Sequence, residues 1–101
     1  MNFERITWHQ AQQLLEETGE QGAYLLDCRD EQSFEQSHVI GALHLSSASV
    51  TEFVATADFD RPVLVYCYHG NSSQSAAAYL AEQGFEKAYS IDGGFEEYPN
   101  Q

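Results

Sequence analysis

The chain has 101 residues, 43% of them hydrophobic and 13% aromatic, and a formal net charge of −12. This length fits a single domain over residues 1–101 whose core needs no disulfide staples. With 4 basic residues against 16 acidic ones, the composition argues against nucleic acid and anionic membranes as partners, because both bind clustered lysine and arginine.

The sequence also predicts the compartment in which the protein works. Its apolar runs are a few residues long, far short of the ~20 residues that span a bilayer. The first five residues have neither a basic start nor an apolar stretch, so we expect no signal peptide. Two cysteines, Cys28 and Cys67, are too few for a disulfide framework, which favours a cytoplasmic location.

The first half of the chain alternates predicted strands and helices. A short strand is predicted over residues 3–6, and a capping box, Thr7 with Gln10, begins a helix that ends near Gly19. Residues 23–28 are an apolar run with a polar exit, which predicts a buried strand.

A short helix and a short strand are predicted next, over residues 30–37 and 42–45. Ser49 with Glu52 repeats the capping-box pattern and predicts a helix that reaches about Thr56.

The second half continues the alternation. Residues 62–66 predict a buried strand, residues 73–83 a helix that Gly84 ends, and residues 88–91 a last strand before the turn at 92–94. Strands alternating with helices predict an α/β fold, with a mainly parallel sheet covered by helices on both faces.

Functional sites in such sheets lie at the carboxyl ends of the strands. Four residues fall at predicted strand ends: Asp27, Cys28, Cys67 and Asp92. This placement favours a functional role for Cys67.

The most informative segment joins the 62–66 strand to the next helix. It is Cys67-Tyr68-His69-Gly70-Asn71-Ser72-Ser73. Backbone N–H groups of such a loop, and of the first helical turn, can all point at the cysteine sulfur. They lower a thiol pKa from ~8.5 to values such as ~6.5 and favour the nucleophilic thiolate. We therefore predict a nucleophile at Cys67 in a partly open setting, whereas free cysteine is usually a small buried hydrophobe.

The other loop residues are predicted to support this sulfur. Gly70 and Asn71 tolerate positive φ, which lets the loop turn its amides inward. Ser72 and Ser73 are natural helix N-caps, and their hydroxyls are candidates to face a bound anion.

Tyr68 is predicted to line the rim of the loop. His69 either tunes the cysteine or holds a substrate, or it is a solvent-facing loop residue, which is the commoner case. No second ligand pair accompanies Cys67 and His69, so no metal site is predicted.

Cys28 has two readings. It is either a buried residue at a strand end, which we favour, or a second thiol near the site that captures an oxidised Cys67.

Several nucleophile chemistries do not fit the loop. Cysteine phosphatases place an arginine six positions after the cysteine, and Ser73 stands there; no arginine or lysine occurs from residue 63 through 86. Dithiol exchange through Cys-x-x-Cys needs a cysteine where Gly70 stands. The Gly-x-Ser-x-Gly pattern of serine hydrolases is also missing.

Four segments together resemble the landmarks of a rhodanese domain. They are Leu26-Asp27-Cys28-Arg29-Asp30, Ser37-His38-Val39-Ile40-Gly41-Ala42, residues 63–73, and Ile91-Asp92-Gly93-Gly94-Phe95. The loop at 67–73 is similar to the active loop of the short single-domain bacterial thiosulfate sulfurtransferases of that family.

The resemblance implies a five-stranded parallel sheet and a persulfide on Cys67, held by the backbone amides of residues 68–72, with no metal or organic cofactor. The implied reaction moves sulfur from thiosulfate, a small anionic donor, or from another persulfide. Its acceptor is cyanide or a thiol such as thioredoxin or dihydrolipoate, and the kinetics are ping-pong. Asp27 and Arg29 match structural positions near the site. The alternative is a rhodanese-like binding or regulatory module without turnover.

Two residues depart from the family pattern. Gln74 stands where a lysine or arginine is expected, and Cys28 where an aliphatic residue is usual. Without that cation, and with a charge of −12, we expect weak affinity for thiosulfate.

Overall fold

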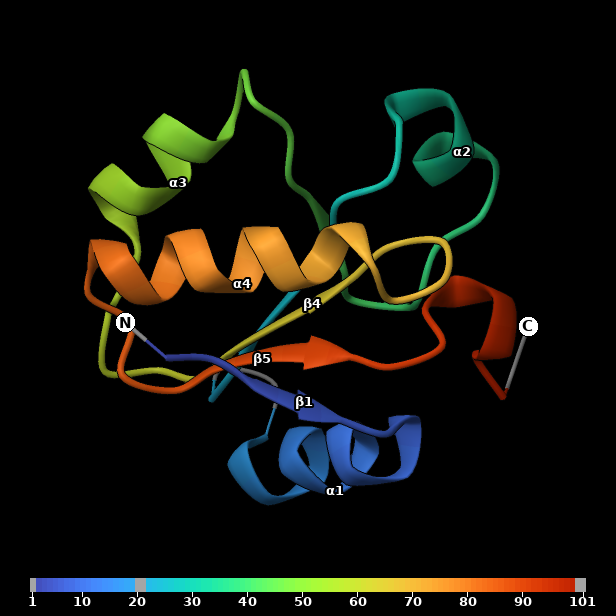
Figure 1. Cartoon of the computed structure of the whole chain (residues 1–101), viewed down its shortest axis with the longest axis horizontal. Coiled ribbons are helices and arrows are strands. Elements are labelled where there is room, and N and C mark those ends of the chain that lie inside the picture. Colours follow the sequence, from blue (N-terminus) through green and yellow to red (C-terminus); the bar gives the residue numbers. More distant parts are fainter. Residues whose placement is uncertain (1, 20–21, 100–101) are drawn as a thin grey trace.

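The computed structural model describes residues 2–19 and 22–99, which form strands and helices in alternation (Figure 1). The strands are β1 (Glu4–Ile6), β2 (Tyr24–Asp27), β3 (Leu43–His44), β4 (Val63–Tyr66) and β5 (Ala88–Ile91). The helices are α1 (Trp8–Thr18), α2 (Glu31–Gln36), α3 (Val50–Thr56), α4 (Ser72–Gln83) and the short 3₁₀ helix η1 (Phe95–Glu97). None of the helices in these ranges is long and apolar enough to cross a bilayer.

The five strands form one sheet in the order β1-β5-β4-β2-β3, and every neighbouring pair is parallel. The predicted α/β fold with a five-stranded parallel sheet is therefore confirmed. Parallel strands all end at the same edge, and β2 and β4 are neighbours there, with Asp27 opposite Tyr66. The chain leaves this edge at Cys28 and Cys67.

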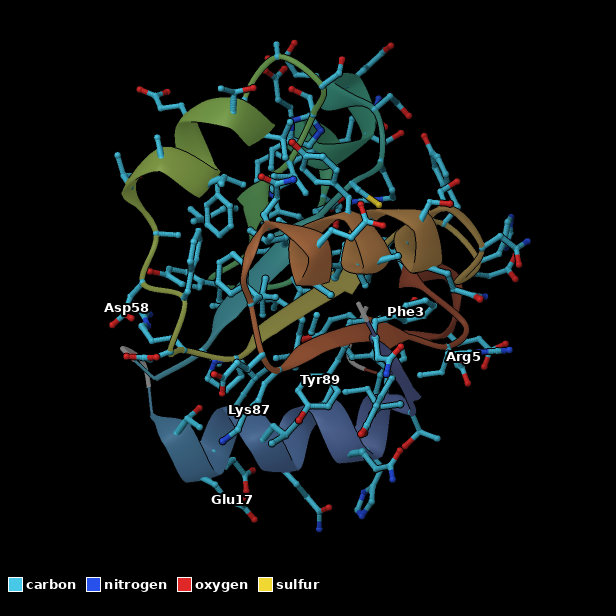
Figure 2. The ribbon with its side chains drawn as sticks, turned by 60° about the vertical axis from the view of Figure 1, so that its left-hand side comes forward. Phe3, Arg5, Glu17, Asp58, Lys87 and Tyr89 are labelled. Carbon is cyan, nitrogen blue, oxygen red and sulfur yellow. The ribbon has the colours of Figure 1, made fainter. Side chains whose placement is uncertain are left out.

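Helices cover both faces of the sheet (Figure 1). On one face, α1 packs against a core that includes Leu25, Leu64 and Ile91. On the other, α3 and α4 pack against a core that includes Leu26 and Val65. Figure 2 shows Tyr89 of β5 between the sheet and α1, where its ring packs against the first core. Apolar burial on both faces is what makes β4, with all four residues buried, a continuous apolar run.

The first helix begins as its capping box predicts. The Gln10 N–H donates to Thr7 Oγ1 over 3.1 Å, and the Thr7 N–H donates to Gln10 Oε1 over 2.9 Å. Two N–H groups that the helix leaves unpaired are satisfied in this way.

The capping box predicted at Ser49 and Glu52 is wrong. Ser49 makes no side-chain capping bond to α3. The capping side chain is Ser46, three residues earlier. Its Oγ accepts hydrogen bonds from the Ala48 N–H over 3.2 Å and from the Ser49 N–H over 3.1 Å. The chain bends at Ser46 because Leu45 still belongs to the sheet ladder, its N–H bonded to the Asp27 carbonyl over 2.8 Å.

Small residues set the position of α4 over the sheet. Ala77 is fully buried, and Ala76 and Ala81 pack against the second core. Gly84 ends the helix with a φ of 130°, a left-handed conformation that favours glycine. The close approach brings the first turn of α4 to the loop that follows β4.

Candidate functional site

The sulfur of Cys67 lies at the end of β4, among donors from the loop and from the first turn of α4. The Gly70 N–H donates to Cys67 Sγ over 3.2 Å and the Ser73 N–H over 3.3 Å. Ser73 Oγ is 3.4 Å from the same sulfur. Inward-pointing amides are thus present as the loop pattern predicts, and they favour negative charge on the sulfur.

Cys67 is more enclosed than the sequence predicts. The residue is only 3% exposed, so the expectation of a partly open cysteine is wrong. The reason lies in the neighbours of the sulfur: Gly70 and Ser73, whose N–H groups contact it, are themselves buried. Around it, the exposed residues Tyr68, His69, Asn71 and Ser72 form the surface of the loop.

Hydrogen bonds lower the pKa of Cys67 to about 4. The largest cause is a hydrogen bond from the Cys28 thiol, followed by those from the Ser73 hydroxyl, the Ser73 N–H and the Gly70 N–H; burial opposes them. The pKa of Cys28 is raised, first because its thiol is hydrogen-bonded to Cys67 and second because burial disfavours the charged thiolate. Cys67 is therefore the thiolate of the pair and Cys28 the thiol.

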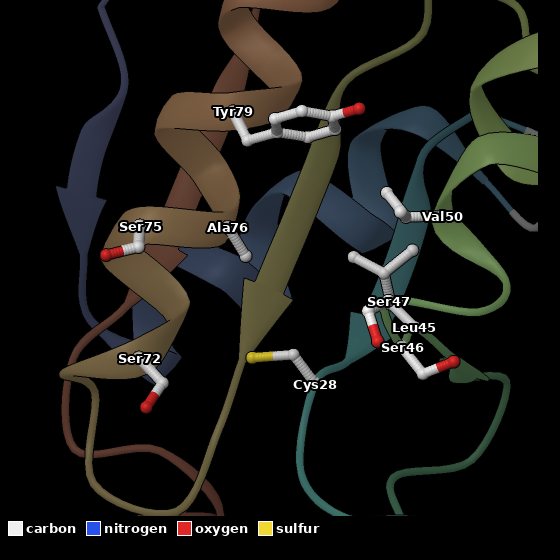
Figure 3. A pocket seen from close by; sticks show the side chains of 9 residues that line it. All are labelled: Cys28, Leu45, Ser46, Ser47, Val50, Ser72, Ser75, Ala76 and Tyr79. Carbon is white, nitrogen blue, oxygen red and sulfur yellow. The ribbon is translucent and has the colours of Figure 1, made fainter.

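Cys28 is half-buried, so the favoured expectation of a buried residue at the strand end is wrong. It lines a cavity of about 360 Å³ between α4 and α3, together with apolar residues that include Leu45, Val50, Ala76 and Tyr79. Figure 3 shows the Cys28 sulfur pointing towards the end of β4 from this cavity. A second cavity, of about 660 Å³, also has Cys28 in its wall.

The loop uses some of its residues differently from what the sequence predicts. Gly70 adopts a positive φ of 101°, but Asn71 has a φ of −89°. Asn71 is the N-cap position of α4 and makes no side-chain capping bond. Ser72 and Ser73 lie inside the first turn, so their predicted capping role is wrong. Their hydroxyls are free for other contacts, and that of Ser73 faces Cys67.

Tyr68 and His69 contact elements on either side of the loop. The Tyr68 hydroxyl is 2.9 Å from Ser33 Oγ of α2, and the residue is 44% exposed, which agrees with a position at the rim. His69 Nδ1 is 3.2 Å from Glu96 Oε1 on an exposed surface. The hydrogen bond found for its ring therefore leads away from Cys67 to the C-terminal segment.

Three residues support the loop through contacts that the sequence did not predict. Ser90 of β5 is fully buried, and its hydroxyl lies 2.7 Å from Ser73 Oγ. The Gln74 side chain donates to the Gly70 carbonyl over 2.9 Å, so the residue that replaces the expected cation holds the loop. At Gly94, with a φ of 60°, an added Cβ would stand 2.5 Å from the Cys67 carbonyl oxygen.

The segment after Gly94 fixes the loop from behind. The Phe95 N–H donates to the Cys67 carbonyl over 2.7 Å, and the Glu96 N–H donates to the Tyr68 carbonyl over 3.1 Å. These carbonyls are thereby turned towards the C-terminal segment. In the sequence, the glycine pair at 93–94 predicted a turn. It did not indicate that the turn contacts the loop after β4.

Asp27 and Arg29 form a buried ion pair beside the loop. Arg29 Nη2 donates to Asp27 Oδ2 over 2.7 Å and to the Ser37 carbonyl over 2.6 Å. The guanidinium also lies 4.1 Å from the centre of the Phe95 ring. The contacts are those of a structural support, as the resemblance implies. No group of three or more potential metal ligands occurs in residues 2–19 and 22–99.

Comparisons with known proteins identify relatives of this chain. Residues 7–101 match the family model described as "Rhodanese-like domain". A protein named thiosulfate sulfurtransferase GlpE from Pseudomonas savastanoi pv. phaseolicola (strain 1448A / Race 6) is 55% identical over 93% of this chain and 85% of its own length. Its namesake from Pseudomonas aeruginosa (strain LESB58) is 54% identical over 93% of this chain and 82% of its own.

Solved structures share the fold at lower sequence identity. The crystal structure of a rhodanese-like domain protein from Staphylococcus aureus superposes with a TM-score of 0.80, covering 95% of this chain and 91% of that one at 17% identity. A family match across most of the chain and relatives above half identity lead to the same conclusion: the chain belongs to the rhodanese-like domain family.

Proposed function

We propose that this chain is a thiosulfate sulfurtransferase that carries sulfur on Cys67. The observation that carries the proposal is the convergence of the Gly70 and Ser73 N–H groups and the Ser73 hydroxyl on one sulfur atom. The relatives' printed activity supports it, at 55% identity. Residues 1–101 are proposed to act as one rhodanese domain.

The first half-reaction uses the thiolate that this environment favours. Cys67 Sγ attacks the outer sulfur of thiosulfate, the S–S bond of thiosulfate breaks, and sulfite leaves with the bonding electron pair. The product is a Cys67 persulfide, a covalent intermediate. Backbone amides of residues 68–72 and the Ser73 hydroxyl are proposed to stabilise its negative charge.

The second half-reaction removes the outer sulfur. Cyanide, or a thiol such as thioredoxin or dihydrolipoate, attacks that sulfur and the Cys67 thiolate leaves. A thiol with a low pKa is a good leaving group, so the environment that activates Cys67 for attack also favours its release. No metal or organic cofactor takes part in either step of this scheme.

The proposed compartment is the cytoplasm. Cys28 and Cys67 are both free thiols, and a pair of thiols in contact persists best where the surroundings are reducing.

The experiment that tests this function measures both products. With thiosulfate and cyanide, the parent should form sulfite and thiocyanate with ping-pong kinetics, and Cys67→Ser should form neither above background. Equal rates above background for the parent and Cys67→Ser would overturn the role of Cys67. A parent that forms neither product would favour the alternative, a binding or regulatory module without turnover.

A further inference from the structure

Cys28 and Cys67 are neighbours in space because β2 and β4 are paired. Asp27 stands opposite Tyr66 in the ladder, and the Cys28 N–H continues it by donating to the Tyr66 carbonyl over 2.9 Å. Cys28 and Cys67 are thus the next residues on two adjacent strands. Their separation of 39 positions in the sequence gives no sign of this contact.

The geometry is compatible with a bond between the two sulfurs. Neighbouring strands lie ~4.8 Å apart, and disulfides join Cα atoms that are ~4.4–6.8 Å apart. The Cys28 side chain is near enough to Cys67 to lower the pKa of that thiol, and its sulfur points towards the end of β4 (Figure 3). Both side chains occupy the α4 side of the sheet, where Leu26 and Val65, two residues earlier on each strand, are buried in the same core.

The two thiols differ in access. Cys67 is 3% exposed, whereas Cys28 is half-buried and lines the two cavities described above, the first of which also has Ser72 of the loop in its wall. A small product released from this pair can therefore leave through the adjacent cavity. A reductant from solution can reach Cys28 more easily than Cys67.

We propose that Cys28 is a second reacting thiol, which attacks the inner sulfur of the Cys67 persulfide and expels the outer sulfur as hydrosulfide. The inference rests on the proposed function, because it starts from that persulfide. The Cys28–Sγ to Cys67–Sγ bond forms and the persulfide S–S bond breaks. The Cys28 proton passes to the outer sulfur, which leaves with the bonding electrons as HS⁻.

The contact explains why the inner sulfur is the one attacked. In the resting site the two residues continue adjacent paired strands, which places the Cys28 thiol beside Cys67 Sγ itself, the atom that becomes the inner sulfur. After persulfide formation the negative charge sits on the outer sulfur, which can accept the Cys28 proton and so generate the attacking thiolate.

Formation of the Cys28–Cys67 disulfide would give the chain a further activity, the reduction of thiosulfate. Thiosulfate has then been reduced to sulfite and hydrosulfide, and the two protein thiols have been oxidised to a disulfide. An external dithiol restores both thiols by exchange, so the chain acts as a thiosulfate reductase whenever the acceptor of the sulfur is slower than Cys28.

The test is a reaction of the reduced parent with thiosulfate alone, without cyanide or any thiol. We expect about one sulfite and one sulfide per chain. The intact mass should fall by two hydrogen atoms, and a peptide linking Cys28 to Cys67 should be found after digestion without reductant. Dithiol treatment should return the starting mass.

The matched variant is Cys28→Ser, whose hydroxyl keeps a donor next to Cys67 but removes the attacking sulfur. Its sulfide-to-sulfite ratio should fall at least ~tenfold below that of the parent, and its mass should show one added sulfur atom. The ratio is independent of how fast either protein reacts with thiosulfate.

Three outcomes separate the two proposals. Sulfite release with one added sulfur and no sulfide in the parent overturns this inference and leaves the proposed function intact. A persulfide located on Cys28 overturns it too, since it requires attack on the outer sulfur. No sulfite from the parent, as from Cys67→Ser, overturns both.

A functional measurement tests the same inference. Incubation of the parent with thiosulfate alone should abolish later thiocyanate formation until a dithiol is added, whereas Cys28→Ser should need no dithiol to resume. Equal behaviour of the two proteins would contradict a disulfide at this site.

Discussion

At the scale of single residues, the site depends on which groups surround one sulfur atom. Cys67 receives hydrogen bonds from two backbone amides, from the Ser73 hydroxyl and from Cys28. Ser73 is held in turn by Ser90, 2.7 Å away. These groups come from the loop, from α4, from the residue after β2 and, behind Ser73, from β5, so the charge on Cys67 depends on several elements at the carboxyl edge of the sheet.

The pH dependence of Cys67 follows from its lowered pKa. A depressed pKa means that the thiolate persists as the pH falls through the ordinary thiol range near ~8.5 and is lost only on approach to about 4. Thiolate absorbance in the ultraviolet should show this titration. Cys28 should add nothing to it there, because its own pKa is raised.

The Cys67 titration has two controls. Cys67→Ser should lose the absorbance. Ser73→Ala should move the midpoint upward by about one pH unit or more, because a hydrogen bond to a charged group contributes about 1.5–3 kcal/mol. A parent midpoint at the ordinary thiol value would contradict this account of the site.

At the scale of elements, the loop at residues 67–73 is held between α4 and the segment that follows β5. Phe95 and Glu96 donate backbone hydrogen bonds to the carbonyls of Cys67 and Tyr68, and Trp8 Nε1 donates to the Gly94 carbonyl over 2.8 Å. The loop therefore has a backbone support from the segment after β5, and Gly94 is where this segment approaches the backbone of Cys67 and Tyr68 closely.

Gly94→Ala should disturb the loop by steric contact. Its Cβ would lie 2.5 Å from backbone atoms of Cys67 and Tyr68, so the loop must move. We expect a loss of at least ~1–3 kcal/mol in the free energy of unfolding and a large drop in kcat for thiocyanate formation.

Gly41→Ala is the matched control for Gly94→Ala. Gly41 also has a positive φ, 89°, but an added Cβ there meets nothing within 4 Å. It should share the conformational cost and keep the sulfur-transfer kcat. Denaturant unfolding and steady-state kinetics of both variants give the comparison, and equal loss of kcat in the two would contradict a support role for Gly94.

At the scale of the whole molecule, the distribution of charge decides how an anionic donor is received. The net charge is −12, and each of the four basic residues lies away from the loop or is paired. Arg29 pairs with Asp27, and Arg5 with Asp92. Arg61 and Lys87 precede β4 and β5, at the opposite edge of the sheet from Cys67. Figure 2 labels Arg5 on β1 and Lys87 just before β5.

The affinity for thiosulfate should therefore be weak and dependent on salt. Repulsion between a dianion and this surface raises KM at low ionic strength, and added salt screens it, so KM should fall severalfold between about 0.01 and 0.15 M salt. The KM for a neutral thiol acceptor is the control and should change little. A low-micromolar KM for thiosulfate at physiological salt would show that the loop amides alone overcome the surface charge.

Short sequence patterns were sufficient to predict the helices and strands and to identify the family. Short local patterns predicted the five strands, Thr7 with Gln10 predicted the start of α1, and Gly84 predicted the end of α4, because each depends on residues within one helical turn or one strand. The predictions that failed were also local. Ser46 and Ser49 are equally good capping residues, and the ladder contact of Leu45 decides between them.

The sequence by itself determined the alternation of strands and helices, the position of Cys67 at a strand end, and the small polar loop whose amides surround it. Only the tertiary structure decided what lies next to that sulfur. Cys28, Ser90 and Gly94 reach the site through the order β1-β5-β4-β2-β3. Which parallel strands pair is set by burial on both faces of the sheet, and residue patterns along one strand carry no record of its neighbours.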